Sequence, residues 1–148
     1  MAKIIAVSRS EKKGIRKEPV PCGCFRENYG LDDDAHAEPD INRQVSLLAI
    51  ESISKMRNLG FDVNPGDFAE NLTTRGIELL SLPVGTRLKV GAEVTLEISQ
   101  IGKECHSGCA IFRQIGKCVM PKEGVFARVI RAGEIRPGDE IIVSGGEA

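Results

Sequence analysis

The segment IGKECHSGCAI, residues 101–111, concentrates side chains that can do chemistry. Cys105, His106 and Cys109 lie within five positions, and Cys118 follows further along. Structural zinc takes four Cys or His ligands, and cysteines also hold iron–sulfur clusters. The spacing C-x3-C-x8-C lacks the paired C-x2-C ligands of the common zinc sites. Free cysteines are also commonly buried and inert. A metal site and an inert turn are therefore both open interpretations.

The same segment also carries groups that activate a thiol. The thiolate is the nucleophilic form of cysteine, and nearby cations, histidine or backbone amides favour it. His106 is adjacent to Cys105, and Lys103 and Arg113 flank the loop. Cys109 follows a Ser-Gly pair, so its sulfur could project from a rigid turn. A reactive thiol is therefore a further open interpretation of this segment.

A second polar stretch, GLDDDAHAEPDINRQ at residues 30–44, precedes an expected helix. It contains three consecutive carboxylates, followed by His36 and Arg43. These groups could bind a metal or anchor a ligand. They could equally form a solvated acidic loop whose charge complements the helix dipole, and the residues alone favour this plainer interpretation.

A third stretch, PGDFAENLTTRGI at residues 65–77, gathers hydrogen-bonding side chains between two glycines. Glu70, Asn71, Thr73 and Arg75 are among them. Such a loop can present amides and side chains to an anion. Asn and Thr also commonly cap their own turn. Walker and Rossmann spacings are missing, so a nucleotide is not inferred.

Length and composition limit the class of protein. The 148 residues fit one domain, 1–148, with a core at about 3–143 and a tail at 144–148. Twenty Lys and Arg balance 21 Asp and Glu, which argues against nucleic acid as a partner. No apolar run is long enough for a membrane span or a signal peptide, so we expect a cytoplasmic protein that makes no membrane contact.

Five cysteines in a reducing compartment favour metal or thiol chemistry over structural disulfides. Cys22 and Cys24 lie too close in sequence to bridge without strain, so we expect both to be reduced and structural.

The elements that position these segments are mostly strands. Prolines 19 and 21 favour an extended edge strand or a loop around them. Short β-branched or alternating apolar runs predict strands. They lie within residues 3–8, 86–90, 93–99, 124–133 and 136–144.

One helix is predicted over residues 45–59. Val45, Leu48, Met56 and Leu59 follow helical spacing, and a glycine succeeds them as a natural stop. With 16 Gly and 7 Pro supplying turns, this pattern predicts a mainly β protein, a barrel or a sandwich.

Taken together, these stretches resemble a MOSC domain. This module is found at the C-terminus of molybdenum-cofactor sulfurases and as small stand-alone bacterial proteins. Six segments carry the resemblance in order along nearly the whole chain: IIAVSRSEKKGIRKEPV, GLDDDAHAEPDINRQVSLLA, PGDFAENLTTRGIEL, LPVGTRLKVG, ISQIGKECHSGCAI and MPKEGVFARVIRAGEIRPGD. The chain departs from the family pattern at Asp33, where many members have glycine.

The resemblance implies a mainly β fold, a closed barrel of the pyruvate-kinase type with a few short helices. It also implies a cysteine that carries sulfur as a persulfide or ligates molybdenum. By motif this residue is Cys109, with Cys105 the runner-up and His106 beside it as a group that favours the thiolate.

The resemblance further implies a site for the molybdenum cofactor, which is a molybdopterin. The "EN" turn and the "DAHA…RQ" segment would supply most of its contacts, and basic groups would complete it. The candidate residues are Asp34, His36, Arg43, Gln44, Glu70, Asn71, Thr73 and Arg128, with Lys12 and Lys13 as further cations. We expect the pocket residues to converge with Cys109 around one cleft.

The implied function is sulfur transfer to the molybdenum cofactor, or binding and handover of that cofactor. The chain has no pyridoxal-phosphate desulfurase segment, so a cysteine desulfurase would donate the sulfur. Molybdenum-cofactor biosynthesis proteins or molybdoenzymes would be the other partners. Two alternatives stay open: a small molybdenum-dependent reductase of N-hydroxylated compounds, and a zinc- or partner-binding module without catalysis.

Overall fold

The computed structural model describes residues 2–13, 15–102 and 123–144. Within these ranges, residues in strands clearly outnumber residues in helices, as predicted. The elements in chain order are β1 (Lys3–Arg9), β2 (Glu18–Val20), β3 (Gly23–Arg26), β4 (Gly30–Leu31), β5 (Val45–Ala49), α1 (Ile50–Asn58), β6 (Leu72–Arg75), the 3₁₀ helix η1 (Leu79–Ser81), β7 (Arg87–Val90), β8 (Val94–Ile101), β9 (Val125–Arg131), β10 (Gly133–Ile135) and β11 (Ile141–Val143).

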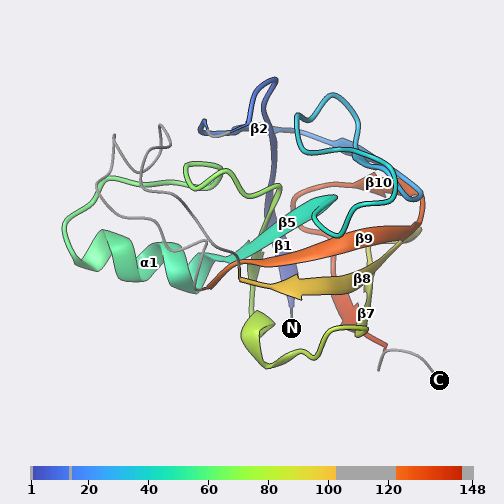
Figure 1. The fold of residues 1–148 in the computed structure, drawn as a ribbon. Helices are drawn as coiled ribbons and strands as arrows, with labels where there is room; N and C mark the ends of the chain where they lie inside the picture. Colours follow the sequence, from blue (N-terminus) through green and yellow to red (C-terminus); the bar gives the residue numbers. More distant parts are fainter. Residues whose placement is uncertain (1, 14, 103–122, 145–148) are drawn as a thin grey trace.

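Eight strands form one large, curled sheet (Figure 1). Its strand order is β11-β7-β8-β9-β5-β6-β1-β2, and neighbouring strands are antiparallel except β5 and β6, which are parallel. The pairing shifts register once along β1 and twice along β8. Such bulges bend a strand and increase its twist, which helps the sheet to curl.

The expected closed barrel is only partly formed, because the large sheet is a half-barrel. One edge of β1 pairs with β2 through residues 7–9. The start of the same edge meets the chain before β11 through an isolated bridge between Lys3 and Glu140. Backbone hydrogen bonds of 2.7–2.9 Å flank this bridge, including Ile4 N to Asp139 O. Since β2 occupies the rest of that edge, β1 and β11 form no continuous ladder.

A second sheet, β10-β3-β4, packs against the large one. The main hydrophobic core joins Phe25, Leu31 and Ile135 from the small sheet to residues of the large sheet such as Leu47 and Leu96. Burial of this apolar surface is the main stabilising contribution to such a fold. Both sheets are therefore parts of one packed unit.

The predicted helix begins five residues later than expected. Residues 45–49 form β5, and only Ile50–Asn58 form α1. Strand β5 is buried on both faces: Leu47 faces the main core, and Leu48 faces a second cluster under α1 that contains Ile53 and Met56. A strand buried on both faces does not alternate between apolar and polar residues. Two of the apolar residues of β5 also fit the spacing of a helix, so the sequence pattern extended the predicted helix over this strand.

The other strand predictions are confirmed, and β2, which contains Pro19, is an edge strand. Ser144, at the start of the predicted tail, still donates a backbone hydrogen bond to Arg87 O at 2.8 Å. No helix among the described residues has the length and apolar character needed to cross a membrane.

Candidate functional site

A fully buried lysine lies directly before β2. The side chain of Lys17 has no exposed surface. Its ammonium donates to Asp34 Oδ1 at 2.7 Å and to Ser10 Oγ at 3.0 Å, and it lies 3.0 Å from His36 Nδ1. A charge is stable inside a protein only when it is paired and hydrogen-bonded. These three partners meet that requirement, and we call Lys17, Asp34, Ser10 and His36 the lysine centre.

Asp34 is held as a carboxylate in this centre. Besides Lys17, it accepts hydrogen bonds from the backbone N–H of Ser10 and of His36, each at 3.1 Å. Burial alone would raise the pKa of Asp34, but the hydrogen bond and charge of Lys17 outweigh it. The pKa of Asp34 is therefore lowered from its usual value, with a further contribution from the side chain of Asn71.

Asn71 ties three strands together beside the lysine centre. Its side-chain oxygen accepts from Ser46 N at 3.0 Å and Ser46 Oγ at 3.2 Å, and its amide nitrogen donates to Ser8 O at 3.1 Å. Its backbone N–H also donates to Ser46 Oγ at 2.9 Å. These bonds fix the end of β1, the start of β5 and the residue before β6, so the site rests on rigid strands.

Glu70 is a buried carboxyl group with only half of its acceptors satisfied. Its Oε2 accepts from Gly66 N and Thr73 Oγ1, each at 2.8 Å. Its Oε1 has no hydrogen-bond partner among the described residues. Desolvation outweighs the hydrogen bonds and raises the pKa of Glu70 to about 7. Glu70 therefore changes charge near neutral pH.

Gly66 connects the Glu70 turn to the lysine centre. Lys17 N donates to Gly66 O at 2.8 Å. Gly66 has φ +91°, and a Cβ there would collide with the carbonyl oxygen of Lys17. Only glycine permits this approach, which brings the two segments together.

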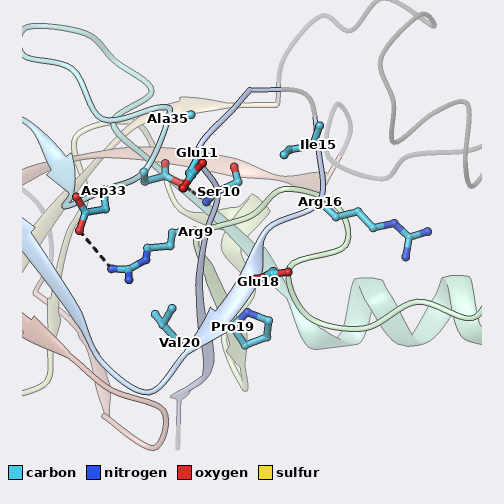
Figure 2. A pocket seen from close by; sticks show the side chains of 11 residues that line it. Arg9, Ser10, Glu11, Ile15, Arg16, Glu18, Pro19, Val20, Asp33 and Ala35 are labelled. Carbon is cyan, nitrogen blue, oxygen red and sulfur yellow. Dashed lines mark hydrogen bonds and ion pairs between the residues drawn. The ribbon is translucent and has the colours of Figure 1, made fainter.

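A cavity of about 750 Å³ opens beside the lysine centre (Figure 2). Ser10 and Asp34 belong to both the centre and the cavity. The remaining lining comes from the end of β1, the following loop, β2 and the turn after β4. These residues are Arg9, Glu11, Ile15, Arg16, Glu18, Pro19, Val20, Asp33 and Ala35.

The cavity lining is charged, with both signs represented. Arg9 reaches towards Asp33, whereas Arg16 extends in the other direction (Figure 2). The Arg9–Asp33 pair is long, at 3.8 Å, and the Asp33 side chain is 82% exposed. An ion pair of this kind contributes little, so a bound anion could replace Asp33 as the partner of Arg9.

The sequence pattern of the MOSC domain matches residues 32–142, about three quarters of the chain. The chain belongs to the MOSC domain family. This family is associated with molybdenum-cofactor proteins. A search of curated proteins found no match.

Solved structures share the fold of this MOSC domain at low sequence identity. The YuaD protein from Bacillus subtilis superposes with a TM-score of 0.80 at 18% identity, covering 99% of this chain and 98% of that one. YiiM from Geobacillus stearothermophilus gives 0.72 at 21% identity, covering 97% and 75%. YiiM from Escherichia coli gives 0.71 at 18% identity, covering 100% and 72%.

Five of the predicted site residues come together in the MOSC domain. Asp34 and His36 belong to the lysine centre, and Asn71 contributes a hydrogen bond to Asp34. Glu70 and Thr73 lie behind them, joined through Gly66. Asn71, Glu70 and Thr73 have no exposed surface and do not line the cavity. They position the site rather than reach into it.

Two further cofactor candidates, Gln44 and Arg128, hold a loop. Gln44 donates to Asn28 Oδ1 at 2.9 Å and Glu38 O at 3.2 Å, and it accepts from Val129 N at 3.1 Å. Arg128 donates to Ile41 O at 3.2 Å. We call Gln44, Asn28 and Arg128 the loop anchor.

The side chains of the other basic candidates are not part of the lysine centre, although the backbone carbonyl of Lys12 accepts a hydrogen bond from Ser10 Oγ at 2.8 Å. Arg43 is exposed and lies over the ring of Phe126, 5.8 Å from its centroid. Lys12 and Lys13 are exposed. None of these three residues lines the cavity.

The predicted cysteine loop, with Cys105, His106 and Cys109, lies outside the described residues. Its position relative to the cavity therefore stays a prediction. Within the described part of the chain, no group of three or more His, Cys, Asp or Glu side chains could hold a metal ion.

Sequence reasoning missed Lys17, Ser10 and Ser46. Lys17 was one of several cations in a polar segment, and neither its residue type nor its spacing marked it as buried.

Proposed function

We propose that this MOSC domain binds the molybdenum cofactor in the cavity beside the lysine centre, and that it serves sulfuration or handover of that cofactor. The observation that supports the proposal is a charged cavity of about 750 Å³ bounded by a buried, rigidly held ion pair. This volume lies within the range of roughly 300–1,000 Å³ that small-molecule sites occupy.

The residues present fit the chemistry of the cofactor, a pterin that carries a phosphate. Arg9 would hold the phosphate, since a guanidinium forms paired, charge-assisted hydrogen bonds with phosphate oxygens. Glu11 and Glu18 would accept hydrogen bonds from the amino-pyrimidine edge of the pterin. Asp34 and Ser10 form the wall that the lysine centre keeps rigid. When bound, the cofactor would supply the dithiolene sulfurs that hold molybdenum.

Sulfur transfer would use Cys109. Its thiolate would attack the terminal sulfur of a persulfide on a cysteine desulfurase. One sulfur–sulfur bond forms on Cys109 as the bond within the donor persulfide breaks, and the donor cysteine leaves as a thiolate. This role rests on the family motif CHSGC, with Cys105 as the other candidate.

Cofactor content tests the binding site. The protein would be purified from cells that make the cofactor, with molybdenum measured by mass spectrometry and the pterin by fluorescence after oxidative release. We expect Arg9→Met to lose most of the bound pterin, and Lys12→Met, an exposed cation outside the cavity, to retain it. Equal pterin content in the two variants would contradict the assigned cavity.

Persulfide loading tests the sulfur step separately. We expect Cys109→Ser to abolish loading from a desulfurase and Cys105→Ser to preserve it. If only Cys105→Ser fails, Cys105 is the carrier. Normal loading of both variants would exclude this loop as the carrier.

A further inference from the structure

One carboxylate of the cavity lining holds the cation that a bound anion would need. Asp33 and Arg9 both line the cavity, and Arg9 Nη1 lies 3.8 Å from Asp33 Oδ2 (Figure 2). This distance is too long for a hydrogen bond, so the contact is an ion pair only. The Arg9 and Asp33 side chains are 40% and 82% exposed, so water screens their attraction. Asp33 is therefore an internal anion that occupies Arg9 loosely.

The strand pairing alone would predict a different partner for Arg9. Glu18 lies directly opposite Arg9 in the pairing of β1 with β2, and oppositely charged cross-strand neighbours commonly interact. Within the described ranges, however, Arg9 pairs with Asp33 and forms no ion pair with Glu18. Figure 2 shows the Arg9 and Glu18 side chains extending in different directions. The partner of Arg9 thus comes from the turn after β4 and not from the neighbouring strand.

We propose that Asp33 competes with the phosphate of the ligand for Arg9 and thereby keeps phosphate binding in the cavity weak and reversible. Because this concerns how the same cavity releases its ligand, the inference rests on the proposed function. Asp33 is tethered beside Arg9, so it competes at every ligand concentration. When phosphate binds, the mostly exposed Asp33 side chain moves into water and leaves no buried charge without a partner. A cavity that hands its ligand to another protein needs such a limit on affinity.

The size of the effect follows from the strength of the ion pair. Exposed ion pairs are typically populated about one to five times as often as their separated state. A competitor of that strength weakens the binding of every anion by the same factor, about two to six. Direct repulsion between Asp33 and the ligand acts differently, because it weakens the binding of a dianion more than that of a monoanion. The charge of the probe therefore separates competition from repulsion.

Asp33→Asn removes the charge and keeps the shape of the side chain. Asp33 has φ +66°, a left-handed conformation that asparagine also enters readily. The turn that leads into Asp34 should therefore keep its geometry. Glu18→Gln is the matched comparison, because it removes the same charge from the same cavity lining at a residue that does not pair with Arg9.

Inorganic phosphate is the probe for this proposal. It is titrated into the wild type and each variant at constant ionic strength, at about pH 6 as mainly the monoanion and at about pH 8 as mainly the dianion. The backbone N–H signal of residue 9 in NMR spectra reports the Kd. We expect Asp33→Asn to tighten phosphate binding about two- to sixfold, by the same factor at both pH values. Glu18→Gln should tighten it less, and Arg9→Met should abolish it.

An unchanged Kd in Asp33→Asn, a greater tightening for the dianion than for the monoanion, or an equal tightening in Glu18→Gln would each overturn the proposal. So would the absence of phosphate binding in both the wild type and Asp33→Asn. The proposed function fails separately from this inference. Phosphate titrations as expected in a protein that holds no pterin would contradict only the proposed function. Bound pterin together with an unchanged Kd in Asp33→Asn would contradict only the competition by Asp33.

Discussion

The lysine centre and the loop anchor draw on the same polar segment, yet they use it differently. Asp34 and His36 enter the lysine centre, where a charged pair is fully buried beside a cavity. Gln44 enters the loop anchor, where a neutral amide bonds to backbone and side-chain groups of the loop and β9. A buried charge depends on its partner far more than a neutral amide does. The lysine centre should therefore be the more sensitive of the two to single changes.

Lys17→Met gives the largest expected effect. It leaves the Asp34 carboxylate buried without its counter-ion. Breaking one side of a buried ion pair typically costs about 3–5 kcal/mol. We expect the free energy of unfolding, measured by urea denaturation, to fall by about that amount. Arg128→Met, which removes one hydrogen bond to a carbonyl of the loop, should cost about 1 kcal/mol.

A double variant checks the cause of this loss. Asp34→Asn removes the charge that Lys17→Met strands, so the pair of changes should cost less than the sum of the two single ones. If the two losses simply add, the Lys17–Asp34 interaction is not the source of the destabilisation.

Glu70→Gln should change how stability depends on pH. The pKa of Glu70 is about 7 in the folded protein and 4.5 as the reference. The folded state therefore binds the proton more tightly, and this stabilisation is complete below pH 4.5 and lost as the pH rises to about 7. Glutamine resembles the protonated form. We expect the variant to match wild type at pH 4.5 and to exceed it above pH 7, by up to about 3 kcal/mol.

Urea unfolding of both proteins across this pH range is the measurement. Equal pH profiles would show that Glu70 is already ionised in the folded protein at low pH. Glu27→Gln is a suitable control, since the Glu27 side chain is exposed, and its difference from wild type should be small beside that of Glu70→Gln.

The sequence predicted those strands that bury only one face, because their apolar and polar residues alternate. Val94, Leu96 and Ile98 alternate along β8, and the strand followed directly. Strand β5 was assigned to a helix because both of its faces are buried. The half-barrel could not be foreseen, because closure depends on which strand occupies one edge of β1, a pairing that no local pattern reports.

The grouping of the candidate residues was predicted in part, through their motifs. Asp34, His36 and Asn71 do come together, because Lys17 and the strand ends place their segments side by side. Gln44 belongs to the same motif, but its side chain bonds to Asn28 and Val129 instead. Residue type shows that a side chain can form hydrogen bonds, whereas the partner depends on tertiary packing.

Asn71→Ala and Gln44→Ala compare the two regions directly. Each leaves buried backbone groups without a partner, at about 1–3 kcal/mol. Only Asn71 also supports the Asp34 carboxylate. Because the pKa of Asp34 is lower in the folded protein than in the unfolded chain, Asp34 stabilises the fold when the pH is above the pKa of the unfolded chain. This contribution disappears as the pH falls through the pKa of the folded protein. We expect Asn71→Ala to begin acid unfolding at a higher pH than Gln44→Ala. Identical acid midpoints would mean that Asn71 does not act on Asp34.

The smallest expected effect concerns the two turns that directly precede Glu70 and Asp34. Ala69 precedes Glu70 with φ +66°, and Asp33 precedes Asp34 with the same φ. Alanine is strained in this left-handed region, whereas aspartate enters it more readily. The Asp33 turn is thus kept without the glycine of the family pattern.

Ala69→Gly should relieve that strain and raise the free energy of unfolding by about 1 kcal/mol or less, since the greater freedom of glycine in the unfolded chain offsets part of the gain. Asp33→Gly should change stability by about half as much or not at all, because aspartate carries less strain to relieve. Thermal denaturation of the two variants beside wild type measures the difference. A larger gain from Asp33→Gly would place the greater backbone strain in the Asp34 turn and reverse this ranking.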